Sequence, residues 1–308
     1  MPKAYVFTRY GGPETEALTD VARPSPGPGQ LLVAVRAAGV NPVDWKLRTG
    51  YRRPGESGER VFPAVFGSEA AGVVEEVGAG VTGFAVGDAV FGNTVDGAYA
   101  EYALLAAAVT AHKPAGLSFT DAATLPVAAA TAYDGIRQLG LAEGATLLVT
   151  GAGGGVGAAA VQIARAFGVR VVGVASEQKK DFVASLGAVH VAGGPDLADR
   201  VRATVPGGVD AVFDLVGDRT LAEAAALLAD RTKLITAAAP PATVAELGGS
   251  RVVRARTAAV LDAVAALVLR GALDPHITRT FPLDLAEEAL RTVEDGHALG
   301  KIVIEVAA

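Results

Sequence analysis

Residues 146–157 read Thr-Leu-Leu-Val-Thr-Gly-Ala-Gly-Gly-Gly-Val-Gly, an apolar segment that runs into a glycine-rich turn. The apolar residues Val156–Phe167 follow and have the pattern of a helix. Strand, glycine-rich turn and helix in this order are the context that a dinucleotide fingerprint requires. Glycine lets the backbone approach a pyrophosphate, and the N–H groups of the helix N-terminus attract its charge. The stretch therefore predicts a nucleotide site at Gly154, Gly155, Val156 and Gly157.

The strict G-x-G-x-x-G spacing is not met, because Ala152 stands where the first glycine belongs. A glycine-rich turn that serves only close packing of a helix on a strand is the competing interpretation. The strand before the turn and the strand–helix alternation after it favour nucleotide binding.

Apolar strands alternate with helical segments through the region that surrounds this turn. Such a rhythm is typical of a parallel sheet covered on both faces, so we expect an α/β, doubly wound Rossmann fold. The predicted strands are Thr146–Thr150, Arg170–Ala175, Val189–Ala192, Ala211–Leu215 and Leu234–Ala237, and the predicted helices are Val156–Phe167, Gln178–Leu186, Leu197–Val205, Leu221–Leu228 and Thr257–Arg270.

The first ~115 residues have a different pattern, in which short apolar stretches are separated by Pro and Gly clusters. This pattern predicts a β-rich, barrel-like or sandwich unit. Its predicted strands include Ala4–Thr8, Leu31–Ala37, Ala70–Val77 and Ala89–Phe91, and a capped helix is expected to start at Ser118. The tail holds strands near 277–280 and 302–306 with a helix at 285–294, and it breaks the alternating rhythm. We therefore expect one domain of residues 1–118 and 272–308, with a second, residues 119–271, inserted into it.

The end of the second predicted strand of the nucleotide domain bears on the choice between NAD and NADP. An NAD site favours an acidic residue there, whereas this chain has Ala175. Ser176 and Lys180 follow and could hold a 2′-phosphate, while Glu177 argues mildly against one. Solvated residues at a helix start are the alternative. The pattern favours NADPH as the cofactor.

Composition excludes several classes of site and partner. The chain of 308 residues has no cysteine, so disulfides, thiol catalysis and cysteine-ligated metals are excluded, and its four histidines are scattered. We therefore expect no metal. A formal charge of −6 gives no overall field for nucleic acid or anionic lipid. No secretory signal is recognisable, and the uncharged run Gly144–Ala164 contains too many glycines for a membrane span, so a cytoplasmic protein is expected.

Several ordered motifs resemble those of one enzyme family along essentially the whole chain. They are Ala38–Lys46, Gly67–Gly78, Val86–Gly92, Gly97–Tyr102, Leu125–Pro126 with Thr131–Tyr133, and Gly300–Val303. The chain resembles the zinc-free quinone oxidoreductase (zeta-crystallin-like) branch of the medium-chain dehydrogenase/reductase superfamily. The resemblance implies a Rossmann domain inserted in a GroES-like catalytic domain, with the cofactor in the cleft between them and a dimer formed through the Rossmann edge, near Val252–Val253.

Departures from the zinc-dependent relatives bear on mechanism. Those enzymes carry a cysteine where this chain has Asn41 and a histidine where it has Ser68. Amide and hydroxyl groups are poor replacements for thiolate and imidazole ligands. The resemblance therefore implies metal-free hydride transfer from NADPH to a small-molecule quinone or related conjugated carbonyl. A reductase of enone, 2-alkenal or enoyl-thioester double bonds is the alternative, and a non-catalytic NADPH-binding sensor or structural protein is a third.

The resemblance also assigns roles to single residues. Asn41 and Thr131 are expected beside the nicotinamide, and Asp44 with Lys46 as a positioning pair. Tyr51 is the candidate proton donor. The alternatives are a turn-forming Asn before Pro42, a helix-surface Thr, an ordinary ion pair and a Tyr packed on a rim.

Further expected cofactor contacts come from backbone at strand ends, at Val216, Gly217 and Ala238. Some relatives place a tyrosine after the third Rossmann strand to help hold a 2′-phosphate. This chain has Ala192-Gly193-Gly194-Pro195 there. Either Ser176 and the lysines suffice to hold the phosphate, or the preference for NADPH is less strict than in those relatives.

Overall fold

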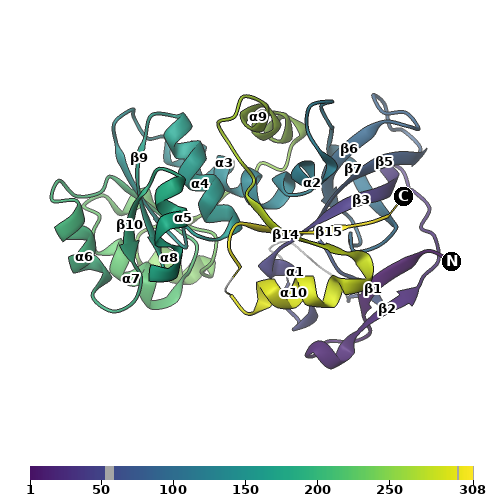
Figure 1. Cartoon of the computed structure of the whole chain (residues 1–308), viewed down its shortest axis with the longest axis horizontal. Coiled ribbons are helices and arrows are strands. Elements are labelled where there is room, and N and C mark those ends of the chain that lie inside the picture. Colours follow the sequence, from purple (N-terminus) through teal and green to yellow (C-terminus); the bar gives the residue numbers. More distant parts are fainter. Residues whose placement is uncertain (53–58, 297, 308) are drawn as a thin grey trace. The chain divides into compact units, whose positions relative to one another are not determined.

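A computed structural model describes residues 1–52, 59–296 and 298–307 (Figure 1). The chain divides into two compact units, each with its own sheets. The first contains residues 1–127, 256–265 and 277–308, and the second contains residues 128–255 and 266–276. The predicted domain limits, after residues 118 and 271, stay a proposal.

The second unit is built on a six-stranded sheet whose neighbours all pair in parallel. The order is β10-β9-β8-β11-β12-β13, which is 3-2-1-4-5-6 when the strands are numbered within this unit, the Rossmann order. The predicted α/β class and doubly wound sheet are thus confirmed. The strands are β8 (Thr146–Thr150), β9 (Arg170–Ala175), β10 (Val189–Ala192), β11 (Ala211–Asp214), β12 (Leu234–Thr236) and β13 (Ser250–Arg251).

Helices cover both faces of this sheet because successive strand residues point to opposite sides. On one face Leu148, Val172 and Val212 form a core with α6 (Leu197–Thr204), α7 (Asp218–Ala225) and α8 (Pro241–Glu246). On the other face a Cβ at Gly135 of α3 (Ala130–Leu139) would lie 2.7 Å from the Phe213 ring. The helices α4 (Gly155–Ala166) and α5 (Lys180–Ser185) also contact this sheet (Figure 1).

The first unit is centred on antiparallel strands that close into a ring. β7 (Tyr102–His112) pairs with β6 (Ala89–Thr94) and with β3 (Gln30–Val40), while β5 (Glu69–Val77) joins β3 to β6. The barrel-like expectation is therefore correct. The C-terminal strand β15 (Lys301–Glu305) extends the sheet by pairing with β3, and β14 (Ile277–Pro282) pairs with β15.

The first unit also contains a small sheet, and short helices and turns complete both units. A small sheet of β1 (Lys3–Phe7), β2 (Glu16–Asp20) and β4 (Ala64–Val65) packs aromatic rings, with Phe7 and Phe66 centroids 4.8 Å apart. The other elements are α1 (Pro42–Arg48), α2 (Phe119–Ala122), a π-helical turn (Leu125–Ala129), α9 (Ala258–Leu269), α10 (Ala286–Glu294) and 3₁₀ turns at Pro13–Thr15, Glu177–Lys179, Arg231–Lys233 and Leu283–Leu285.

Three details differ from the expectations. The helix that starts at Ser118 has the predicted cap, since the hydroxyl of Ser118 accepts from the Asp121 N–H, but it ends after one turn and the π-helical turn follows. The edge strand expected near Val252–Val253 is Ser250–Arg251. Strands β2 and β7 were not predicted, because their segments carry no regular alternation. Within the described residues, no helix is long and apolar enough to cross a membrane.

Candidate functional site

The glycine-rich turn presents the N-terminus of α4 without a side chain over it. Gly154 is the N-cap and provides no side-chain hydrogen bond to the first turn, so backbone N–H groups there are available to an anion. A Cβ at Gly157 would lie 2.2 Å from the Gly151 carbonyl oxygen, and Gly151 itself has φ +68°. Close packing and a left-handed turn thus require glycine at these two positions. The turn fits the pyrophosphate of a dinucleotide.

Several polar side chains follow β9, and one of them, Lys179, lies against the glycine-rich turn. The stem of Lys179 lies over the turn, since a Cβ at Gly153 would approach its Cδ to 2.5 Å. Burial lowers the pKa of Lys179. Lys180 and Ser176 are exposed, and the Lys180 amine lies 3.6 Å from the Glu177 carboxylate. Lys179, which the sequence-based choice passed over, is therefore the lysine best placed beside the glycine-rich turn.

The ends of β11 and β12 have their backbone N–H groups turned inward. The N–H of Val216 donates to Asp214 Oδ1 at 3.2 Å, and the N–H of Ala238 donates to Thr236 Oγ1 at 3.0 Å. A ligand at these strand ends would therefore meet carbonyl oxygens. Gly217 has φ +86°, which explains why a glycine stands there.

In the first unit, Asn41 belongs to a buried polar cluster with Glu69 and Lys301. Its Nδ2 donates to Glu69 Oε1 at 2.7 Å, and its Oδ1 accepts from Lys301 Nζ at 2.7 Å. The Lys301 ammonium also lies 3.0 Å from Glu69 Oε1. All three side chains are buried, and a Cβ at Gly39 would lie 2.1 Å from Glu69 Oε1. The Asn41 amide is therefore fixed in one orientation.

Asp44 lies at the start of α1, one turn from Asn41. Its carboxylate accepts from the Asn41 N–H at 2.9 Å, from Ser68 Oγ at 2.5 Å and from Tyr99 Oη at 2.8 Å. Burial, followed by the charge of Asp44, raises the pKa of Tyr99 well above its usual value. Asp44 therefore joins α1 to the segments just before β5 and β7, which carry Ser68 and Tyr99.

Asp44 and Lys46 do not share this environment. Residues two apart on a helix point in different directions, and here Asp44 is buried while Lys46 is exposed with its Nζ 5.5 Å from the Trp45 ring centroid. The sequence-based expectation of a pair between them is not supported by this arrangement. Tyr51 follows α1 with its side chain 39% exposed and its N–H bonded to the Lys46 carbonyl. The polar, Gly-rich sequence Arg52–Val61 that follows predicts a loop facing the substrate, and residues 53–58 of it lie outside the described residues.

Thr131 lies in the second unit, on α3. Its hydroxyl accepts from Arg254 Nη1 at 2.6 Å, and Arg254 Nε lies 3.0 Å from the Asp134 carboxylate. Asn41, Asp44 and Tyr51 thus come from one segment of the first unit, whereas Thr131 and the glycine-rich turn belong to the second.

The polar groups at the two positions where zinc-dependent relatives carry ligands do not suit a zinc ion. Asn41 and Ser68 supply an amide and a hydroxyl, which are weak ligands beside the Cys and His that zinc prefers. The Asn41 and Glu69 oxygens already face the Lys301 ammonium. Among the described residues, no group of three or more His, Cys, Asp or Glu could hold a metal.

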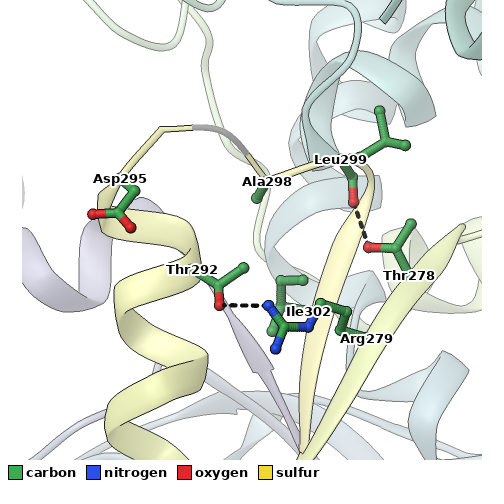
Figure 2. A pocket seen from close by; sticks show the side chains of 7 residues that line it. All are labelled: Thr278, Arg279, Thr292, Asp295, Ala298, Leu299 and Ile302. Atoms are coloured by element: carbon green, nitrogen blue, oxygen red, sulfur yellow. Dashed lines mark hydrogen bonds between the residues drawn. The ribbon is translucent and has the colours of Figure 1, made fainter. Parts of the chain in front are cut away.

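Sequence reasoning missed Glu69, Tyr99, Lys179 and Lys301 as members of these clusters. Glu69, Tyr99 and Lys301 all lie inside the family-like motifs, so a charged or phenolic residue within an otherwise apolar stretch was the available signal. A separate open hollow of about 530 Å³ lies beside β14, and Figure 2 shows the Arg279 guanidinium bonded to Thr292 there. It contains none of the expected site residues.

Two family models match the chain. Residues 27–115 match the alcohol dehydrogenase GroES-like domain, and residues 186–304 match a model described as zinc-binding dehydrogenase. The second model is described as zinc-binding, whereas this chain has Asn41 and Ser68 at the two positions where zinc-dependent relatives carry ligands.

Individual proteins are similar over nearly the full length. The chain is 32% identical to the chloroplastic quinone-oxidoreductase homolog of Spinacia oleracea, covering 98% of each protein. It is 33% identical to the 2-methylene-furan-3-one reductase of Solanum lycopersicum, over 98% of this chain and 78% of the relative. A solved mycobacterial structure complexed with NADPH superposes with a TM-score of 0.86 at 30% identity, covering 99% of this chain and 100% of the other. The glycine-rich Rossmann unit, the GroES-like barrel and these similarities together show that the chain belongs to the quinone oxidoreductase-like group of the medium-chain dehydrogenase/reductase family of oxidoreductases.

Proposed function

We propose that this oxidoreductase transfers a hydride from NADPH to a quinone or a related conjugated carbonyl without help from a metal. The observation that carries the proposal is the uncapped N-terminus of α4 at Gly154, with Lys179 over the same turn. A bound NADPH supplies the hydride, and the chain supplies binding, orientation and a proton where the product needs one.

The second unit holds the cofactor in this proposal. The N–H groups of Gly155, Val156 and Gly157 bind the pyrophosphate, and Lys179 with Ser176 binds the 2′-phosphate through charge-assisted hydrogen bonds. Lys180 contributes less, because Glu177 lies beside it. Carbonyl oxygens at Val216 and Ala238, together with Thr131, contact the remainder of the cofactor.

In the first unit, the polar cluster around Asn41 is the group we assign to the acceptor. Lys301 and Glu69 hold the Asn41 amide, and Asp44 fixes the backbone at the start of α1. A quinone or enone is already activated by conjugation, so its reduction needs no Lewis acid at this position, unlike that of a simple aldehyde. The donor set of Asn41 and Ser68 supports this metal-independent chemistry.

A double-bond reductase is the second candidate, and it is supported by the name of the tomato relative, a furanone reductase. Tyr51 matters most to this candidate. Its Oη would donate a proton to the carbanion or enolate that remains after hydride addition, whereas a reduced quinone takes its protons from water.

The test is an acceptor panel. Purified protein is mixed with NADPH or NADH and with 1,4-benzoquinone, an α,β-unsaturated ketone, a 2-alkenal and an enoyl thioester, and products are identified by mass spectrometry. We expect turnover with NADPH on the quinone or the enones, and weaker turnover with NADH. Tight NADPH binding without turnover of any acceptor would instead support the third hypothesis, a cofactor-binding protein without catalysis.

We also propose a cytoplasmic homodimer, which sedimentation of the purified protein and cell fractionation would check.

A further inference from the structure

A fully buried carboxylate, Asp214, lies at the carboxyl end of β11 and collects donors from three segments of the second unit. Thr150 at the end of β8 and Thr236 at the end of β12 each donate a hydroxyl to it at 2.7 Å. The N–H of Val216 donates to Oδ1 at 3.2 Å, and the N–H of Gly217 lies 3.1 Å from both carboxylate oxygens. Asp214, Thr150 and Thr236 are called the strand-end clamp below.

The two threonine hydroxyls extend the clamp into the neighbouring loops. Thr150 Oγ1 accepts from the Leu215 N–H at 3.0 Å, and Thr236 Oγ1 accepts from the N–H groups of Ala238 and Ala239 at 3.0 and 3.1 Å. Each hydroxyl thus donates to Asp214 and accepts from backbone, so its direction is fixed. The clamp holds five loop N–H groups inward, those of residues 215–217 after β11 and 238–239 after β12.

The clamp lies at the edge of the sheet where a cofactor is expected to bind. β8, β11 and β12 are neighbours in the sheet, and the order 3-2-1-4-5-6 reverses between β8 and β11. Ligands of open α/β sheets bind outside the carboxyl ends of strands at such a reversal. Thr150 directly precedes the glycine-rich turn, and residues 216 and 238 are the strand-end residues assigned to the cofactor.

Burying a carboxylate is costly unless hydrogen bonds offset the loss of water, and apolar side chains would pack the end of a sheet at lower cost. The pattern is therefore better explained by what it orients. We propose that Asp214, with Thr150 and Thr236, is a positioning residue of the nicotinamide cofactor site. The clamp fixes the loops after β11 and β12 in the conformation that binds cofactor. This inference rests on the proposed function.

When the clamp is broken, the loops should populate conformations that do not bind cofactor. The apparent Kd then equals the intrinsic Kd divided by the fraction of protein that stays competent to bind. The variants Thr150→Val and Thr236→Val remove one hydroxyl each with little change of shape, and Thr150→Ser and Thr236→Ser retain it. Asp214→Asn places an amide opposite the Gly217 N–H, because that N–H faces both carboxylate oxygens. Thr146→Val is the matched control, a buried threonine at the other end of β8.

The experiment measures the Kd of NADPH by fluorescence titration, with KM and kcat under saturating acceptor and the thermal midpoint of each variant. Thr150→Val and Thr236→Val should each raise the Kd and KM of NADPH about tenfold. The value of kcat at saturating NADPH should stay within about twofold of wild type, since a ligand in excess restores the competent state. The Ser variants and Thr146→Val should bind as wild type does. Asp214→Asn should bind more weakly than either Val variant.

Unchanged Kd values in Thr150→Val and Thr236→Val would overturn the proposal. So would a loss of affinity in the control Thr146→Val that follows its drop in thermal midpoint, because general destabilisation would then explain the weaker binding. Failure of wild-type protein to bind NADPH or NADH would instead refute the proposed function. The two failures are therefore distinguishable. If Asp214→Asn does not fold, the Val and Ser pairs still decide.

Discussion

The ammonium of Lys301 lies 3.0 Å from the carboxylate of Glu69, although the two residues are 232 positions apart in the chain. Both side chains are buried, and Asn41 bonds to both. The second Glu69 oxygen accepts from the Val127 N–H at 2.7 Å, at the π-helical turn. One buried ion pair therefore joins the C-terminal strand β15, the start of α1 and Val127, the last residue of the first unit's segment 1–127.

Removing one member of this pair should leave an uncompensated buried charge. Lys301→Met should destabilise the first unit by about 3–5 kcal/mol. Urea unfolding followed by Trp45 fluorescence measures this, because Trp45 is the single tryptophan and lies in that unit. The double variant Lys301→Met with Glu69→Gln should recover part of the loss. A Lys301→Met protein as stable as wild type would show that the pair contributes little.

Lys179 should govern the affinity for the 2′-phosphate more strongly than Lys180. Lys179→Ala should weaken NADPH binding by roughly 10- to 100-fold, the equivalent of a charge-assisted hydrogen bond, and should leave NADH binding nearly unchanged. Lys180→Ala is the matched control and should have a small effect because Lys180 lies beside Glu177. Isothermal titration with both cofactors decides. Equal losses for NADH and NADPH would contradict a 2′-phosphate role.

The pH dependence of NADPH binding follows from the same lysine. Only its ammonium form attracts phosphate, so affinity is complete below the pKa of Lys179 in the free protein and falls as pH rises through it. Burial lowers that pKa from 10.5, so the decline should begin at a lower pH than for an exposed lysine. Lys179→Arg, which stays charged, should show a flat profile over the same range. An identical decline in wild type and Lys179→Arg would sink this explanation.

Tyr51 is tested by comparing two classes of acceptor. Tyr51→Phe should slow reduction of an enone by about 10²-fold, the lower range for general acid catalysis, and should leave quinone reduction nearly intact. Tyr10→Phe, at another partly exposed tyrosine of the first unit, is the control. Initial rates at saturating NADPH provide the measurement. An equal loss on both acceptors would indicate that Tyr51 positions the substrate and does not act as an acid.

Tyr99 should make the first unit sensitive to alkaline pH. Its pKa is raised in the folded state, so above the unfolded value of about 10 the phenol ionises only after unfolding, and stability falls as pH rises. Tyr99→Phe should remove this contribution to the slope. At neutral pH the same change should cost about 1–3 kcal/mol, because Asp44 loses a donor. The urea midpoints of wild type and Tyr99→Phe are measured from pH 8 to 11 by Trp45 fluorescence. Equal slopes of midpoint against pH in the two proteins would refute the linkage.

The sequence predicted the nucleotide-binding half well, because its regularities are local. The alternation around Gly154 fixes strand, turn and helix in order, and glycine at Gly157 has a steric reason visible in the pattern. The barrel was predicted only as a class. Strand β7 pairs with both β3 and β6, and such long-range pairing leaves little trace in the segment Tyr102–His112 itself.

The candidate site was predictable where a motif names one residue and not where function depends on a partner far along the chain. Asn41 could be selected from its motif, but its contacts with Glu69 and Lys301 arise only when β15 pairs with β3. Which lysine lies beside the phosphate site, Lys179 or Lys180, depends on which side chain lies over Gly153. The two lysines are adjacent in the sequence, so the sequence alone does not distinguish their directions. The acceptor likewise depends on surfaces that single-residue reasoning does not define.

The most direct test of metal-independent hydride transfer is the initial rate of NADPH oxidation with 1,4-benzoquinone by protein freed of metal. The protein is dialysed against a strong chelator, and its zinc content is determined by mass spectrometry. The rate is compared in untreated protein, in chelated protein and in chelated protein after zinc is added. We predict turnover at the same rate in all three preparations. A rate that disappears on chelation and returns with zinc would contradict the account.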